Sequence, residues 1–252
     1  MGTKFPEGDA ASPKSLADIY GSDSAWLLSM SQYTPIFYDG FAKLALSILR
    51  EGAIPRKIKE LILACVYVYQ GFTDGAVLHM KNAIQLGTLD EEIGEMLAAL
   101  VLSRGPRSYF EGIKIWRAAG GNPERGSMPK PSGGNSLDKK DMLKYFEDYY
   151  GSTLPHIRAL FETGHLDVLE GYYQMRKYCI ADMVLSRKYK EFLYVAVNAA
   201  DMRPEAIELH VKGAYDSGVT KEEVLEAMLL GIMAGGVASW LYASKVYEST
   251  AR

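Results

Sequence analysis

The sequence predicts an all-α fold made of two similar helical units. Apolar residues recur at the three- and four-residue spacing of buried helix faces, and no segment has the alternation of a half-buried strand. Residues 57–100 align without a gap with residues 188–231, and twelve of these forty-four positions are identical. Self-similarity of this kind indicates an internal duplication, so we expect both copies to fold alike.

Composition and charge exclude several classes of protein. The 252 residues are 48% apolar with a formal net charge of −3, so a sizeable core is expected and the basic surface of a nucleic-acid binder is not. No apolar run reaches the roughly 18 residues of a membrane span, and the first residues lack the apolar core of a secretory signal. Two cysteines, Cys65 and Cys179, form no disulfide framework. A cytoplasmic protein with no membrane or nucleic-acid partner is therefore expected.

The first unit is predicted over residues 15–118. The helix predicted over residues 56–69 is apolar nearly all round and should be buried. The unit's next helix, over residues 73–86, should be capped by Thr73 or Asp74. Acidic residues open its fourth helix, where the helix dipole favours them. The predicted helices cover residues 15–49 with a break at Thr34-Pro35, then 56–69 up to Gly71, 73–86 up to Gly87, and 88–102.

A change of composition separates the two units. Residues 119–137 are rich in glycine, proline, asparagine and serine, which predicts a linker. Helical pattern resumes near Leu137, so the second unit is predicted over residues 138–252. It replays landmarks of the first unit at an offset of 131 positions: Gly40 and Gly171, Arg56 and Arg187, Gly87 and Gly218, Gly105 and Gly236.

Each copy carries one glutamate and one histidine at the same spacing. Glu60 precedes His79 by nineteen residues, and Glu191 precedes His210 by nineteen. Each histidine lies on the packed face of its helix, so a helix pair that folds back can bring carboxylate and imidazole together. A carboxylate that orients an imidazole suits general acid–base catalysis, because the histidine pKa is about 6.5. A buried pair that only holds two helices together is the alternative.

The repeated motif is similar to that of a known family. Arg-Lys-x-Lys-Glu, an apolar helix, His-x-x-x-Ala-x-x-x-Gly and an acidic helix start resemble the carboxymuconolactone decarboxylase family, which includes the alkylhydroperoxidase D-like proteins. The resemblance covers residues 57–105 and, less clearly, 188–236. It implies two tandem helical domains of this family. Its single-unit members form rings of trimers or hexamers, so the resemblance implies a homotrimer with pseudo-sixfold character.

The resemblance also divides the possible chemistry. The family's peroxidase branch carries a Cys-x-x-Cys pair seven and four residues before the histidine. In this sequence those positions hold Phe72, Gly75, Arg203 and Ala206. Thiol peroxidase chemistry needs an accessible thiolate and a resolving thiol, so we exclude it. The glutamates are nevertheless typical of the peroxidase-like branch, so the chain combines proton-relay residues with no redox pair.

The resemblance therefore implies an enzyme without a cofactor. It would act on a small cyclic or oxo-acid substrate by decarboxylation, isomerisation or a related lyase step. His79 and His210 would be the acid–base groups, with Glu60 and Glu191 orienting them. The alternative is a helical scaffold or ligand-binding protein that keeps each pair for packing.

Three further residues are candidates for substrate binding. Arg203 stands at the position of the family's first cysteine and is a candidate to bind a carboxylate. Asp74 and Glu205 precede the histidines by five residues, about 140° around the helix, so acids that only start a helix are the alternative. The lysines beside the glutamates are expected to be solvated: Lys57, Lys59, Lys188 and Lys190. No metal site is expected, since each half offers one histidine and one carboxylate.

Overall fold

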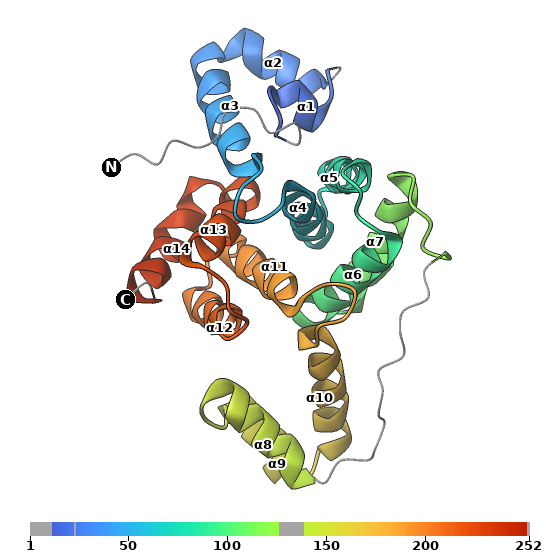
Figure 1. The fold of residues 1–252 in the computed structure, drawn as a ribbon, viewed down its shortest axis with the longest axis vertical. Helices are drawn as coiled ribbons and strands as arrows, with labels where there is room; N and C mark the ends of the chain where they lie inside the picture. The colour runs from blue at the N-terminus through green and yellow to red at the C-terminus, as the bar shows by residue number, and fades with distance from the viewer. Residues whose placement is uncertain (1–11, 23, 126–138, 251–252) are drawn as a thin grey trace.

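The described residues form helices and no strand, which confirms the all-α prediction (Figure 1). The computed structural model describes residues 12–22, 24–125 and 139–250. The first helices are α1 (Leu16–Tyr20), α2 (Ala25–Tyr33), α3 (Pro35–Leu49), α4 (Arg56–Gln70), α5 (Thr73–Gln85), α6 (Asp90–Arg104) and α7 (Pro106–Ala118). The later ones are α8 (Lys139–Tyr150), α9 (Pro155–Glu162), α10 (Leu166–Ile180), α11 (Arg187–Ala200), α12 (Pro204–Tyr215), α13 (Lys221–Gly235) and α14 (Val237–Thr250).

Helix ends follow local chemistry, with one correction to the sequence prediction. Gly71 ends α4 in the left-handed region at φ 76°, as a glycine at this position should. The N-cap of α5 is Phe72, not Thr73 or Asp74, because the chain turns from Gly71 into the helix within two residues. Gly236 has φ 71° and separates α13 from α14.

The two central helices, α4 and α11, are buried along most of their length and contact each other. Helix α4 packs against α5, and α11 packs against α12 and α13 (Figure 1). One cluster of buried apolar residues runs through both predicted units. A second, smaller core joins α8, α9 and α10: Met142, Phe146, Ile157, Leu169 and Tyr173. The predicted linker lies largely outside the described residues.

The two predicted units contact each other reciprocally. Helix α3 packs against α13 of the other unit, and α10 packs against α6. The Lys59 ammonium lies 2.9 Å from the Glu226 carboxylate. At the same offset of 131 positions, Lys190 pairs with Glu95. This recurrence is what a duplicated unit predicts.

The expectation that all four flanking lysines are solvated was wrong for Lys59 and Lys190. Each side chain is 1% exposed. Their aliphatic stems lie in the core, and the ammonium of Lys59 also donates to two carbonyl oxygens, at 3.1 and 2.9 Å. Lys57 and Lys188 remain partly exposed and pair with Glu92 and Glu223.

Candidate functional site

The first Glu–His pair is made and fully enclosed. His79 Nδ1 lies 2.6 Å from Glu60 Oε2, because α5 folds back along α4 after Gly71. Both side chains are 0% exposed. A proton on Nδ1 that is donated to the carboxylate leaves the lone pair on Nε2. That Nε2 atom is buried and has no hydrogen-bond partner among the described residues.

Cationic and aromatic side chains surround this first pair. Arg56 Nε donates to Glu60 Oε1 at 3.0 Å, and Arg56 Nη2 forms an ion pair with the same oxygen at 3.0 Å, so one guanidinium balances one carboxylate. The rings of Tyr20 and Tyr67 lie 5.8 and 5.3 Å from the His79 ring. Burial raises the pKa of Tyr67 to about 12, and its hydroxyl donates to a carbonyl oxygen of α13. The site is therefore packed and neutral in sum when the imidazole is neutral.

The second pair repeats this contact but reaches the surface. His210 Nδ1 lies 2.9 Å from Glu191 Oε2. The His210 side chain is 11% exposed. The ring of Tyr194 lies 4.6 Å from the imidazole ring. An imidazole held by a carboxylate and open on one side can exchange a proton with a bound molecule.

The partners of Glu191 differ from those of Glu60. The Tyr149 hydroxyl donates to Glu191 Oε1 at 2.9 Å, and Arg187 Nε donates to the same oxygen at 3.3 Å. Burial acts to raise the pKa of Glu191, but the hydrogen bond from His210 and the nearby guanidinium charges hold that pKa below its usual value. Glu191 is therefore held as a carboxylate, the form that accepts from His210.

This pKa shift predicts an acid-dependent loss of stability. A carboxyl group whose pKa is lowered in the folded state stabilises that state above its ordinary pKa, and the contribution is lost as the pH falls. We expect the free energy of unfolding to fall below about pH 4.5, the ordinary value for glutamic acid. When the free energy of unfolding is measured by urea titration at several pH values, that of Glu191→Gln should depend less steeply on pH in this range. Glu111→Gln, in an exposed pair, should match the unmodified protein, and equal slopes for all three would contradict the assignment.

A glycine admits Tyr149 to the second site. Gly213 stands where the first unit has Asn82, which donates to Glu60 Oε2 at 3.4 Å. A Cβ atom at Gly213 would lie 2.5 Å from the Tyr149 hydroxyl and 2.6 Å from Glu191 Oε1. The second unit therefore has a phenol donor from α8 where the first unit has an amide donor from α5.

Gly213→Ala should displace Tyr149 from Glu191. We expect a loss of about 1–3 kcal/mol in the free energy of unfolding, measured in denaturant, because the methyl group overpacks a buried hydrogen bond. Gly171→Ala is the control: its Cβ would meet no atom within 4 Å, and a helical alanine should raise stability by up to about 1 kcal/mol. Equal effects of the two substitutions would show that the close approach at Gly213 does not matter.

The other predicted site residues lie on the surface. Arg203 is the N-cap of α12, and its side chain is 60% exposed and 3.9 Å from Asp201. Asp74 and Glu205 are exposed in the first turns of α5 and α12. The structure thus brings the four acid–base candidates together in two pairs and leaves the three binding candidates outside them. Both cysteines are buried, and burial raises the pKa of each thiol.

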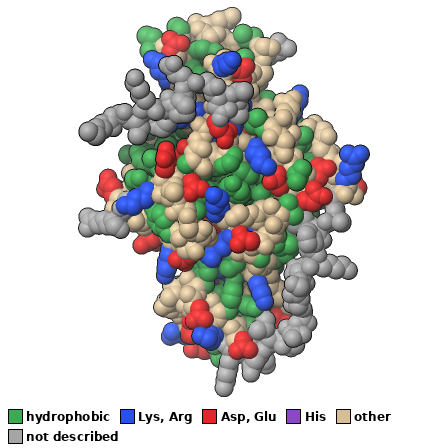
Figure 2. Space-filling view, viewed as in Figure 1, with side chains coloured by type: hydrophobic (Ala, Val, Ile, Leu, Met, Phe, Trp, Pro, Cys, Tyr) green, Lys and Arg blue, Asp and Glu red, His purple; other side chains and the backbone are tan. Residues whose placement is uncertain are grey.

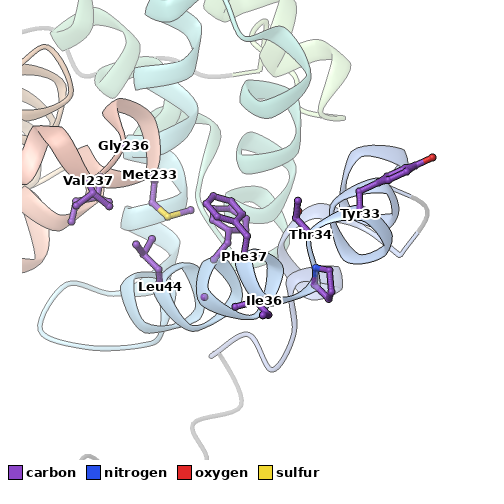
Figure 3. A pocket seen from close by; sticks show the side chains of 12 residues that line it. Tyr33, Thr34, Ile36, Phe37, Leu44, Met233, Gly236 and Val237 are labelled. Atoms are coloured by element: carbon purple, nitrogen blue, oxygen red, sulfur yellow. The ribbon is translucent and has the colours of Figure 1, made fainter.

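An apolar cavity of about 950 Å³ lies beside the first unit (Figure 3). Phe37 and Leu44 of α3 project toward Met233 and Val237 at the junction of α13 and α14. Phe41 lines the same cavity and stacks on Tyr20, whose ring faces His79. The rings of Phe41 and Tyr20 separate this cavity from the imidazole of His79.

One residue of the second site, Arg176, was missed in the sequence analysis. Arg176 of α10 is buried against the Tyr149 and Tyr150 rings, near Glu191. Comparison of the two copies could have singled out Arg176, because the matching position in the first unit holds the small apolar residue Ala45. Within the described ranges, no group of three histidine, cysteine or acidic side chains could hold a metal, and no helix is long and apolar enough to cross a membrane.

Comparisons with known proteins give the family. The model of the carboxymuconolactone decarboxylase family matches residues 167–249. "Uncharacterized protein 4 in cox locus" from Paracoccus denitrificans is 32% identical over 89 residues, which are 34% of this chain and 80% of that protein. The chain belongs to the carboxymuconolactone decarboxylase family. The family model matches the second unit, although the sequence motif is clearer in the first copy.

One solved structure resembles this family member over nearly the whole chain. It is the crystal structure from Burkholderia xenovorans LB400 described as a gamma-carboxymuconolactone decarboxylase subunit. The TM-score is 0.62 at 23% identity, over 93% of this chain and 95% of that one. At this identity the likeness concerns the fold alone. The Glu–His geometry is therefore the guide to chemistry.

Proposed function

We propose that this family member is a cofactor-independent enzyme that transfers protons on a small cyclic or oxo-acid substrate. The supporting observation is that the same Glu–His hydrogen bond is made twice, at 2.6 Å and at 2.9 Å. The reaction would be a decarboxylation, an isomerisation or a related lyase step. It would not be a thiol peroxidase reaction, since both thiols are buried and their pKa values are raised.

The imidazole Nε2 is the proposed proton carrier. The carboxylate holds Nδ1–H, which fixes the tautomer and stabilises the imidazolium that forms. In an isomerisation, Nε2 removes a proton from one substrate carbon and returns it to another. In a decarboxylation, the bond to the carboxylate breaks, carbon dioxide leaves, the electron pair stays on the substrate carbon, and a proton from Nε2–H adds there.

A structural role for the first pair is the second candidate. His79 and Glu60 are 0% exposed and packed beneath two tyrosine rings, which suits a buried polar contact that joins α4 to α5. The second pair differs because His210 remains 11% exposed. We therefore assign proton transfer first to the second pair.

Deuterium exchange tests the enzyme proposal without a known substrate. Small cyclic and oxo acids incubated with the protein in D₂O should, for at least one acid, gain deuterium at carbon or lose carbon dioxide, both visible by NMR. A His79→Gln/His210→Gln double variant that stays folded should lose this activity. Activity that survives in the double variant would contradict the proposal, and a panel with no reactive acid would favour the scaffold.

We also propose that the protein is a homotrimer with pseudo-sixfold character. Large apolar side chains are exposed on α3 and α14: Ile36, Phe37, Val237 and Leu241. The first three line the cavity of Figure 3. On the face drawn in Figure 2, hydrophobic side chains also lie exposed among scattered charges of both signs. Exposed apolar surface of this kind is typical of an interface.

The assembly is tested by mass in solution. We expect light scattering to give three times the chain mass of 27.9 kDa. Phe37→Asp with Leu241→Asp should lower that mass, because charges enter the apolar contact. Leu89→Asp, at an exposed apolar residue elsewhere, is the control and should remain trimeric. A wild-type mass near 27.9 kDa would refute the trimer.

A further inference from the structure

The second site holds a buried guanidinium with unused hydrogen-bond donors. Arg176 is 2% exposed and lies 4.0 Å from the Tyr149 ring and 5.0 Å from the Tyr150 ring. Its Nε and Nη2 atoms are buried and have no hydrogen-bond partner among the described residues. Buried cationic donors are normally paired, because leaving them unpaired is costly. Nε and Nη2 form the edge of a guanidinium that takes a carboxylate through two parallel hydrogen bonds.

A second guanidinium faces the same tyrosine. Arg187 lies 5.4 Å from the Tyr149 ring and donates from Nε to Glu191. Its Nη2 atom is also buried without a partner among the described residues. Since the Tyr149 hydroxyl donates to Glu191 as well, both guanidiniums lie around the carboxylate that holds His210.

The second site therefore has an excess of positive charge. Two guanidiniums, Arg176 and Arg187, act electrostatically on one carboxylate, Glu191. In the first site the count is balanced, because Arg56 pairs with Glu60 and the position of Arg176 holds buried Ala45. One anionic group would balance the second site, and no such need arises in the first.

We propose that the second Glu–His site binds the carboxylate of a small organic acid between Arg176 and Arg187. The Nε and Nη2 edge of Arg176 grips the carboxylate, and Arg187 Nη2 supplies a further donor. The Arg187 side chain is 20% exposed, so this part of the site is not sealed from solvent. This inference deepens the proposed function: it rests on that function for the fate of the acid, and it makes the second unit the active one.

Binding of a fluorinated carboxylate tests the site. We use 4-fluorobenzoate as the probe and 4-fluorobenzamide as its neutral isostere, and follow both by fluorine NMR titration. The full-length protein should bind the benzoate saturably and the benzamide at least tenfold more weakly. Arg176→Met should raise the Kd for the benzoate at least tenfold, because charge-assisted hydrogen bonds are lost. Arg176→Lys keeps the positive charge but loses the two parallel donors of the guanidinium, so its Kd should lie between those of the wild type and Arg176→Met.

Matched variants separate binding from structure. Lys177→Met removes the same charge from an exposed neighbour on α10 and should bind like wild type. His210→Gln should keep benzoate binding, since it leaves both arginines in place. A merely structural Arg176 would lower the melting temperature of Arg176→Met and leave the Kd unchanged. If Arg176→Met does not fold, Arg176→Lys decides: an unchanged Kd overturns the proposal.

Other results would also overturn it. Equal affinity for benzoate and benzamide would show that binding needs no cation. If Arg203→Ala abolishes benzoate binding and Arg176→Met keeps it, the binding site lies at the surface instead. Inorganic phosphate that displaces the benzoate at equal concentration would contradict the carboxylate assignment. Failure of the enzyme proposal can be told apart from failure of this binding site. In the first case benzoate binding still depends on Arg176, but no acid in the panel exchanges deuterium or loses carbon dioxide. Failure of this site leaves exchange that depends on His210 but not on Arg176.

Discussion

His210→Gln is expected to lower turnover by about 10²- to 10⁴-fold while the protein stays folded. Glutamine keeps a polar side chain of similar size but cannot cycle between neutral and protonated forms near neutral pH. The measurement is the rate of deuterium incorporation or carbon dioxide release, with circular dichroism to follow folding. The expectation rests on the 2.9 Å contact to Glu191 and on the 11% exposure of the His210 side chain.

His79→Gln is the matched control for that experiment. The same contact exists in the first unit, but His79 is wholly enclosed, so we expect activity to change by no more than a few-fold. Its cost should appear in stability instead, at about 1–3 kcal/mol, because Glu60 loses a buried charge-assisted partner. A larger loss of turnover for His79→Gln than for His210→Gln would assign the chemistry to the first unit.

Lys190→Met is expected to cost about 3–5 kcal/mol of unfolding free energy. Methionine fills a similar volume but leaves the buried Glu95 carboxylate without its cation. Glu95 also accepts a hydrogen bond from the Leu185 backbone at 2.9 Å, so its position links the two units. Urea denaturation followed by circular dichroism measures the loss.

Two further variants show whether this loss comes from the uncompensated charge. Lys190→Met combined with Glu95→Gln should recover about 1–3 kcal/mol, because the neutral amide oxygen still accepts from Leu185. Lys114→Met breaks an exposed ion pair with Glu111 and should cost less than about 1 kcal/mol. A double variant no more stable than Lys190→Met would mean that packing, not charge, accounts for the loss.

Local sequence patterns predicted much of this architecture. Helical periodicity predicted the all-α class, and Gly71 and Gly87 predicted two helix ends that the structure has. The nineteen-residue spacing predicted that Glu60 and Glu191 can reach their histidines, and both contacts are made. These features depend on residues close in the chain, whose geometry is fixed by the turn of a helix.

Other features depend on residues far apart in the chain. The sequence placed Lys59 and Lys190 in solvent, and both are buried, because each meets an acid from the opposite unit. Arg176 reads as one more helical cation until α8 and α10 bring it beneath Tyr149 and Tyr150. No local pattern records which distant side chains will surround a charge.

The chain alone thus specifies its helices, the spacing of each Glu–His pair and the loss of the redox cysteines. The packing of helices decides what each pair can do. The first pair is sealed and neutral beneath aromatic rings, while the second is partly open and carries a surplus guanidinium. The reason is that burial and charge balance at a site are sums over neighbours from several helices. The Glu–His spacing shared by the two copies therefore could not by itself distinguish them.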